Sequence, residues 1–237
     1  MIGLLGKKLG QTRVYDTEGN LVPVTVLRAG PNYVLQLKTA ASDGYNAVQL
    51  GFDDQKEDRL TKPIRGHLQK HSGKPVKRIR EFRDFSIKVK AGDTVGPSLF
   101  EPGDFVDAIG KTKGRGFQGV VRKYDFAGGT GSHGNKAFHR RPGSIGCRLT
   151  PGTVRKGMRM PGQMGQVRRT VQNLEVVQVI EPEHLILVKG AVPGANGDYV
   201  IIRESKKISK AAAQARREAL AKAKEAAKAK GKGKGKK

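Results

Sequence analysis

Short runs of apolar residues alternate with turn residues through the first part of the chain. Runs rich in Val, Ile, Leu and Tyr at residues 12–15, 21–28, 33–38 and 45–52 are separated by turn sequences such as DTEGN and AGPN. Apolar runs of this length, bounded by Gly, Pro, Asn and Asp, are typical of β-strands joined by tight turns. The pattern predicts a mainly β fold with some α, built as a barrel or a meander.

The same pattern returns after a long gap. Leu174–Ile180, Leu185–Val188 and Tyr199–Arg203 are apolar runs separated by the turns EPEH and PGANGD. Because the pattern on both sides of the gap is alike, we interpret residues 1–110 and 171–205 as one sheet system that forms a β-barrel body. The intervening residues are then an insertion into this body.

Helices are expected at only a few places. A short helix is predicted near Ile64–His71, within the irregular stretch 53–91, and another over Gln118–Tyr124. Residues 206–237 are rich in Ala and Lys, with Leu220 the only large aliphatic residue after Ile208. Without an apolar stripe to dock, this tail is predicted to be disordered, or helical once it meets a polyanion.

The charge of the chain is concentrated in two segments. The 237 residues include 46 Lys or Arg and 21 Asp or Glu, so the formal net charge is +25. Residues 111–170 hold 14 basic residues and one acid, residues 206–237 hold 13 and two, and the remainder is nearly neutral with 19 and 18. A neutral body with basic extensions is expected of a protein that neutralises phosphates. We infer a nucleic-acid partner.

Membrane and secretory functions are not supported by the pattern. We find no run of about 18 apolar residues, and the opening MIGLLGKKLG lacks the charge-then-apolar order of a signal peptide. A single cysteine, Cys147, excludes an internal disulfide and a CxxC zinc framework. The expected location is the cytoplasm, with no membrane partner.

The inserted segment cannot form a core of its own. Residues 127–166 contain many glycines, three prolines and few aliphatic residues. A loop of this length is usually functional or disordered. If it runs out and back over about 20 residues each way, its reach is at most roughly 65 Å, enough to enter a large RNA. The alternative is a flexible cationic loop without an ordered partner. We interpret residues 111–170 as a glycine-rich helix N-terminus followed by an extended RNA-binding arm.

The residue types of the insertion suit RNA. Lys and Arg reach phosphates, glycines allow close approach of the backbone, and His133, Phe138 and His139 are suited to stacking on bases. The residues expected to contact RNA are Lys7, Lys8, Lys113, Arg115, Gly116, Arg122, Lys123, His133, Asn135, Lys136, His139, Arg140, Arg141, Arg148, Leu149, Arg155, Lys156, Arg159, Gln163, Arg168 and Arg169.

A GxGxxG pattern precedes the arm. Gly114, Gly116 and Gly119 lie between an expected strand, Phe105–Gly110, and the expected helix Gln118–Tyr124. A dinucleotide site would need a parallel βαβ unit and an acid about 20 positions further on, where this chain reads KAFHRRPG. The glycines are instead expected to present backbone amides to an RNA phosphate.

Signatures of enzymes and metal sites are incomplete. Ser144 lies in PGSIG, where the nucleophile elbow would need Gly in place of Pro142. His67 and His71 lie four residues apart, but the residues between them lack the glutamate of a zinc protease.

A metal held by His133, His139 and Cys147 is opposed by the surrounding positive charge. We therefore expect no metal, no cofactor, no small-molecule substrate and no catalytic residue.

Several sequence blocks, in order, resemble a known family. They are MIGLLGKKLGQT, DGYNAVQLGF, TKGRGFQGVVRKYDF, SHGNKAFHRRPGSIG, TPGTVRKGMRMPGQMGQVRRTVQNLEVV and LILVKGAVPGANG. They are similar to the bacterial form of the third protein of the large ribosomal subunit, the ribosomal protein L-three family. The resemblance covers about residues 1–205.

The resemblance implies a translation-protein-type β-barrel with a long extended basic loop, bound to large-subunit (23S-type) rRNA near its 3′ region beside neighbouring large-subunit proteins. It also implies an early part in subunit assembly and a loop tip, residues 143–150, that reaches toward the peptidyl transferase centre. Some members carry a methylated glutamine where this chain has Leu149, so that modification is expected to be absent. The tail from Lys206 extends beyond the usual end of the family.

The chain is thus interpreted as a structural constituent of the large subunit and not as an enzyme. One rival is a general nucleic-acid compactor, which would bind duplex DNA as tightly as folded rRNA. The other is an RNA-modifying enzyme, which would need a cofactor pocket or a paired acid and base.

Overall fold

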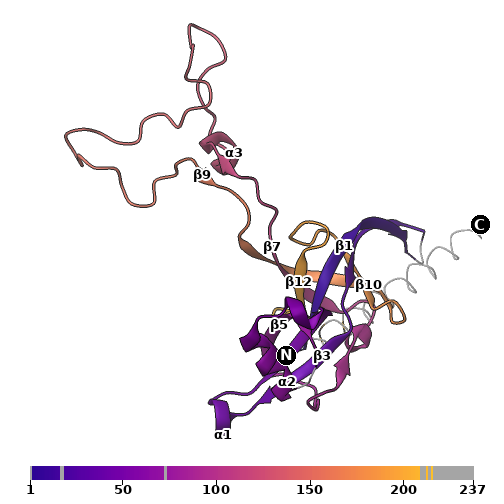
Figure 1. Cartoon of the computed structure of the whole chain (residues 1–237). Helices are drawn as coiled ribbons and strands as arrows, with labels where there is room; N and C mark the ends of the chain where they lie inside the picture. Colours follow the sequence, from indigo (N-terminus) through magenta and orange to yellow (C-terminus); the bar gives the residue numbers. More distant parts are fainter. Residues whose placement is uncertain (1, 17–18, 72–73, 209–211, 213–214, 216–237) are drawn as a thin grey trace, which may run out of the picture. The chain divides into compact units, whose positions relative to one another are not determined.

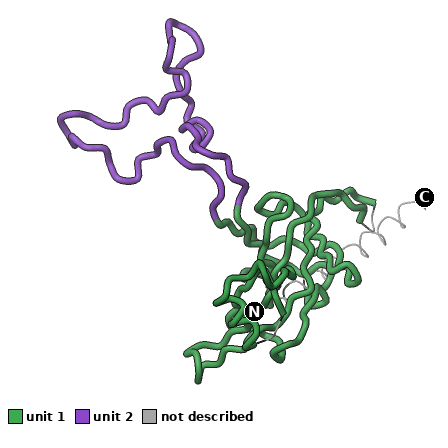
Figure 2. The backbone as a smooth tube through the Cα atoms, in the orientation of Figure 1, with its two compact units in different colours: residues 1–111, 168–237 green, residues 112–167 purple. Residues whose placement is uncertain are grey.

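The computed structural model describes residues 2–16, 19–71, 74–208, 212 and 215. The chain divides into two compact units (Figure 2). The body consists of residues 1–111 and 168–237, and the arm unit consists of residues 112–167. The arm unit is thus an insertion in the sequence of the body.

Six antiparallel strands of the body close into a barrel (Figure 1). In order around the barrel they are β1 (Gly3–Tyr15), β12 (Tyr199–Glu204), β7 (Phe105–Lys111), β10 (Arg168–Ile180), β11 (Leu185–Lys189) and β2 (Leu21–Arg28). The barrel strands contribute fully buried residues to the core, including Leu4, Val106, Val176 and Ile202. The predicted mainly β fold with a barrel is confirmed.

Four further strands form a second sheet. Its order is β5 (Val76–Arg83), β4 (Ala47–Asp54), β3 (Asn32–Lys38) and β6 (Thr94–Val95). The prediction that all body strands belong to one sheet system was therefore wrong. Pro31 lies between β2 and β3, which belong to different sheets, and because proline has no N–H to donate, it does not extend the hydrogen-bonded ladder of either strand. Regular spacing of strands along the sequence did not reveal which strands pair.

The second sheet has two covered faces. Val48, Leu50, Phe52 and Phe82 pack into the same core as the barrel residues. The opposite face is covered by α2 (Lys62–His71), where Leu68 packs against Leu35 and Val76. The helix predicted near Ile64–His71 is confirmed. Short elements complete the body: α1 (Ala40–Asp43) and the 3-10 turns η1 (Glu57–Arg59) and η2 (Pro97–Leu99).

Glycines near the start of the chain belong to a strand that the sequence pattern missed. Strand β1 begins at Gly3, although a strand was predicted only from Thr12. A Cβ on Gly3 would lie 2.3 Å from the Phe82 ring, and one on Gly6 would lie 2.8 Å from the carbonyl oxygen of Arg28. These glycines therefore permit close packing. Apart from residues 206–208, 212 and 215, the predicted tail lies outside the described residues.

Asn32 joins the second sheet to the barrel. Its side chain is fully buried, with 0% exposed. Its amide nitrogen donates to the carbonyl oxygens of Leu5 (3.1 Å) and Ala29 (3.0 Å), and its amide oxygen accepts from the Leu5 N–H at 3.1 Å. Buried polar groups are stable only when their hydrogen bonds are satisfied. Asn32 thus fixes β3 against β1.

We predict that Asn32→Ala lowers the free energy of unfolding by about 2 to 3 kcal/mol, because it leaves buried backbone groups of Leu5 unsatisfied. Urea denaturation of the free protein measures this value. Asn196→Ala, at an exposed asparagine of the body, is the control and is expected to change it by less than about 0.5 kcal/mol. Equal effects of the two substitutions would contradict the assigned role of Asn32.

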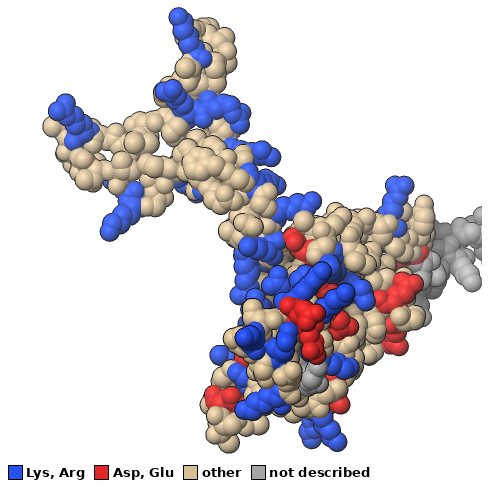
Figure 3. Space-filling view, in the orientation of Figure 1, with Lys and Arg blue, Asp and Glu red and all other residues tan. Residues whose placement is uncertain are grey.

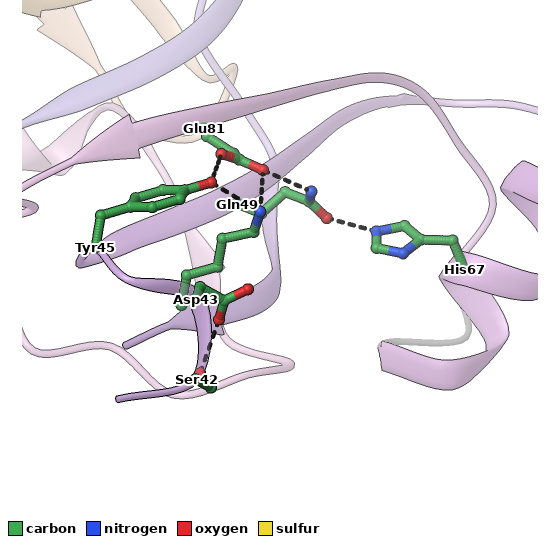
Figure 4. A network of polar contacts seen from close by, with 7 residues as sticks. Ser42, Asp43, Tyr45, Gln49, His67 and Glu81 are labelled. Carbon is green, nitrogen blue, oxygen red and sulfur yellow. Dashed lines mark hydrogen bonds and ion pairs between the residues drawn. The ribbon is translucent and has the colours of Figure 1, made fainter. Parts of the chain in front are cut away.

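A polar network lies on the second sheet, on the side where α2 packs (Figure 4). Glu81 accepts hydrogen bonds from Lys38 (2.9 Å), Tyr45 (2.9 Å) and Gln49 (3.3 Å). The carbonyl oxygen of Gln49 then faces Nε2 of His67 at 2.7 Å. Because the Gln49 amide nitrogen is used on Glu81, this geometry assigns the proton to His67 Nε2.

The hydrogen bond from Lys38, followed by those from Tyr45 and Gln49, lowers the pKa of Glu81. A lowered folded-state pKa contributes stability above the unfolded pKa of about 4.3, and this stability is lost as the pH falls through the folded value. We predict that Glu81→Gln lowers Tm by about 2 °C at pH 7, and that the difference from wild type disappears in acid.

Thermal unfolding across a pH series tests this prediction. Glu183→Gln, at an exposed turn, serves as the control and should not alter Tm at either end of the series. A difference for Glu81→Gln that persists unchanged in acid would show that the carboxylate charge is not what stabilises the network.

Candidate nucleic-acid interface

The arm unit carries positive charge without ion-pair partners. Its sequence contains eleven Lys or Arg and one acid, Asp125. The ion pairs found in the described part of the chain, including the buried pair of Arg203 and Asp107, all lie in the body. Figure 3 shows Lys and Arg spread along the arm unit instead of gathered in one patch. Such a segment attracts a polyanion along its whole length.

The two ends of the arm unit run side by side. The Arg115 N–H donates to the Met164 carbonyl and the Met164 N–H donates to the Gly116 carbonyl, both at 2.9 Å. Next to them β8 (Phe117–Gln118) pairs with β9 (Gly162–Gln163). A Cβ on Gly165 would lie 2.1 Å from the carbonyl oxygen of Lys113, so only glycine fits here.

This pairing changes the interpretation of the GxGxxG segment. Gly116 has a φ of 67° and leads into β8, so the predicted helix begins only at Val120 and α3 spans Val120–Tyr124. Residues 117–118 extend as a strand because β9 is available to pair with them. The preceding strand β7 is antiparallel to both of its neighbours, which leaves no parallel βαβ unit for a dinucleotide.

Two cations are held beside the Tyr124 ring. The Arg159 guanidinium lies 5.6 Å from the ring centroid and the Lys123 ammonium lies 5.1 Å from it. The centroid of the Phe126 ring is 6.3 Å from that of Tyr124. Because Arg159 comes from a later part of the arm sequence, the cluster connects that part to α3. Sequence analysis selected both cations but did not select Tyr124. The pattern that could have indicated it is an aromatic residue directly after two basic residues.

Residues 128–141 form a loop held by backbone contacts. The Gly129 N–H donates to the His139 carbonyl at 3.0 Å. The Thr130 carbonyl accepts from the Asn135 side chain at 2.5 Å and faces Nδ1 of His139 at 3.0 Å. The loop therefore brings the candidate residues Asn135 and His139 together. Other candidates in it, His133, Lys136, Arg140 and Arg141, are exposed.

Residues 143–150, the predicted tip, are exposed throughout. Leu149 is 90% exposed, and Arg148 carries the only charge of the segment. Backbone hydrogen bonds, the largest contribution coming from Leu149, lower the pKa of the Cys147 thiol. An exposed aliphatic side chain at the end of a basic segment is suited to contact and shape recognition more than to charge neutralisation.

The remaining candidates of the arm unit also lie at its surface. Exposed side chains belong to Lys113, Arg115, Arg122, Arg155, Lys156 and Gln163. Phe117, which sequence analysis did not select, is 75% exposed within the segment GRGFQG. An exposed aromatic ring between basic residues is a stacking platform of the kind found in RNA-binding proteins.

Four candidates lie in the body. Lys8 is only 5% exposed, and its ammonium donates to the carbonyl oxygens of Val192 (2.8 Å) and Gly194 (3.2 Å). Because this charge is engaged inside the body, we leave Lys8 out of the interface. Lys7 is half-buried, and its ammonium lies 5.8 Å from the centroid of the Tyr199 ring. Arg168 and Arg169 are exposed on β10.

The two histidines of α2 do not assemble a metal site. His67 bonds to Gln49, and its ring lies 4.8 Å from that of His71. Across the described residues, His, Cys, Asp and Glu form no group of three that would hold a metal ion. In that same part of the chain, none of the helices has the length and apolar character needed to cross a membrane.

Comparison with known proteins shows the family of the chain. Residues 67–183 match the model of the family described as ribosomal protein L3. Large ribosomal subunit protein uL3 of Deinococcus radiodurans is 50% identical over 211 residues, which are 89% of this chain and 98% of that protein. The chain belongs to the ribosomal protein L3 family. The resemblance inferred from the sequence blocks is confirmed.

Two further relatives extend the comparison. The uL3 proteins of Nitrosococcus oceani and Herpetosiphon aurantiacus are 49% and 48% identical, each over 209 residues. The aligned parts cover 87% and 88% of this chain, and 97% and 98% of the relatives. All three relatives are bacterial proteins.

We predict that Gly128→Ala opens the loop formed by residues 128–141. Gly128 has a φ of 79°, and a Cβ there would lie 2.1 Å from the His139 carbonyl oxygen that accepts the Gly129 N–H. Amide hydrogen exchange at Gly129 should therefore become faster. Gly131→Ala is the matched control, since a Cβ at Gly131 meets nothing within 4 Å. Unchanged exchange in Gly128→Ala would show that the loop adapts.

Proposed function

We propose that the chain is a structural constituent of the large ribosomal subunit, present with it in the cytoplasm, and that it binds large-subunit (23S-type) rRNA directly. The observation that carries the proposal is the arm unit itself. Eleven cations lie in a unit that has one acid and whose single buried apolar residue is Val120. Such a unit obtains little stabilising free energy from internal packing, and much more from binding a polyanion.

Binding on this proposal rests on phosphate neutralisation. Each phosphate contact releases counterions, so affinity should fall with roughly the 0.7 to 0.9 power of the salt concentration per contact. The proposed contacts are Lys7, Lys113, Arg115, Gly116, Arg122, Lys123, His133, Asn135, Lys136, His139, Arg140, Arg141, Arg148, Leu149, Arg155, Lys156, Arg159, Gln163, Arg168 and Arg169. The chain contributes no catalytic group and needs no cofactor.

The arm unit divides into anchoring and recognising parts. Arg155, Lys156 and Arg159 have the charge to hold phosphates, whereas the tip at residues 143–150 has little charge and an exposed Leu149. We propose that the basic part anchors the protein during early subunit assembly. The tip then extends toward the peptidyl transferase centre, as the family resemblance implies, and affects that RNA through contact and shape.

The rival functions make different demands. A general compactor would bind duplex DNA as tightly as folded rRNA and would wash off large subunits in high salt. An RNA-modifying enzyme would act on RNA at low stoichiometry instead of remaining in the particle. The three relatives are proteins of the large ribosomal subunit, and they align with this chain along nearly their whole length. This similarity favours the structural role.

We predict that changing Arg155, Lys156 and Arg159 together to Glu lowers incorporation into large subunits about tenfold or more. The matched control in the same arm is Leu149→Asp, which should incorporate normally but alter chemical probing of the rRNA around the peptidyl transferase centre. Gradient sedimentation after a high-salt wash measures incorporation.

Two results would contradict the proposal. Equal loss of incorporation in both variants would show that the arm is not divided into an anchor and a tip. Retention of the triple variant at the wild-type level would show that these cations do not hold the protein on rRNA.

A further inference from the structure

The body contains a cationic pocket that joins residues of the basic segment to arginines from outside it. Its volume is about 310 Å³, and its lining includes Arg78, Arg80, Lys111 and Arg168. All of its lining residues belong to the body. Arg78 and Arg80 come from the nearly neutral part of the sequence, and Lys111 and Arg168 come from near the two ends of the basic segment 111–170. Four cations therefore converge here from segments that are far apart in the sequence.

One wall of the pocket comes from the second sheet. On β5, Arg78 and Arg80 lie opposite Phe52 and Leu50 of β4. Residues opposite each other on antiparallel strands share a face of the sheet. This is the face that packs on the barrel, where Phe82 of the same strand is buried in the core. Where this face of β5 lines the pocket, its residues are Arg78 and Arg80 instead of apolar residues.

The other wall comes from the barrel. Lys111 and Arg168 are register partners at the end of the β7 and β10 pair, and both are exposed. Ile109 and Ile201, which are also register partners, supply apolar lining between the basic residues. The pocket is therefore basic at its rim and apolar within.

The positive charge of the pocket is not balanced by the body. Among the described residues, none of the four cations has an ion-pair partner. Asp198 is the only acid in the lining, and its carboxylate accepts the Ala195 N–H at 2.7 Å. Four cations against one carboxylate leave an excess of positive charge in the lining, which favours an anion. Figure 3 shows Lys and Arg on the face of the body that it presents, with Asp and Glu beside them.

Tyr199 gives the pocket an aromatic side. The Arg78 guanidinium lies 4.5 Å from the centroid of its ring, and the Phe52 ring meets it edge-on with the centroids 6.3 Å apart. The Tyr199 hydroxyl donates to Asp53. Burial, together with this bond, raises the pKa of Tyr199 to about 12, so the phenol remains neutral at physiological pH. The ring is held in place by contacts on several sides.

This combination matches one ligand chemistry. An unstacked nucleotide has an anionic phosphate, which Arg and Lys bind, and a flat base, which packs on aromatic, aliphatic or guanidinium surfaces. We propose that the cationic pocket binds one unstacked nucleotide of a single-stranded RNA segment. Arg80, Lys111 and Arg168 hold the phosphate, and the base lies against Tyr199 and Ile201. The inference rests on the proposed function, since it assumes an RNA partner.

The test uses the full-length protein with Arg80→Ala and Arg168→Ala combined. Both arginines are exposed and outside any ion pair among the described residues, so the fold should be retained. The matched control combines Arg13→Ala and Arg59→Ala, which remove the same charge from other exposed sites of the body. The probe is a single-stranded oligoribonucleotide with 4-thiouridine, used for photocrosslinking and for equilibrium binding.

In the wild type, the crosslink should map to peptides from β5, β7 or β12. The pocket variant should lose that crosslink at least about tenfold and lower the salt-dependence slope for single strands by about 1.4, for two lost contacts. The control should keep the crosslink, and a duplex RNA of the same length should give none in the pocket.

Several outcomes would overturn the proposal. They are a crosslink that does not map to the pocket strands, equal losses in the pocket and control variants, and competition by polyglutamate as strong as by RNA. Free uridine monophosphate binding as tightly as the oligonucleotide would indicate a mononucleotide site instead. If the arm variant loses incorporation while the pocket variant behaves like its control, this inference fails and the proposed function stands.

Discussion

The structure depends on the hydrogen-bonded pairing of β7 with β10, two strands separated in the sequence by the whole arm unit. Their register runs from Phe105 opposite Glu175 to Lys111 opposite Arg168. β7 also pairs with β12, and β10 with β11, so the barrel cannot close without this contact. Because the two strand ends already lie opposite each other, a long insertion between them adds only a slowly growing loop-closure entropy. The body therefore carries the arm at small cost to its own stability.

Much of the body could be predicted from the sequence because β-strands leave a local signal. The run 21–28 is the strand β2, and Leu185–Val188 is β11 without its final residue. The signal failed where packing decides the outcome. Gly3 and Gly6 have the composition of a loop, yet they are strand residues because Phe82 and the Arg28 carbonyl lie against them. A local sequence pattern cannot predict a packing contact with a residue as distant in the sequence as Phe82.

In the candidate interface, too, the sequence predicted the types of residue but not the contacts that they make. The charge pattern identified the basic residues of the arm, but it treated Lys7 and Lys8 alike, although only Lys8 is buried and bonded to carbonyls. Tyr124 was missed because its cation partner Arg159 is distant in the sequence. Of the four cations of the pocket, the charge pattern selected only Arg168. Arg78 and Arg80 were missed because a segment can have little net charge while its basic residues face one side.

The pairing of β1 with β12 has a consequence for how the protein is made. Gly3 lies opposite Arg203, so the strand that is synthesised first must wait for one of the last described strands before the barrel closes. Chains emerge from the N-terminus during synthesis. The arm unit is therefore translated before the barrel of the body can be completed. Until β12 has been synthesised, a nascent chain of this kind has unpaired strand edges and a segment of concentrated positive charge at the same time.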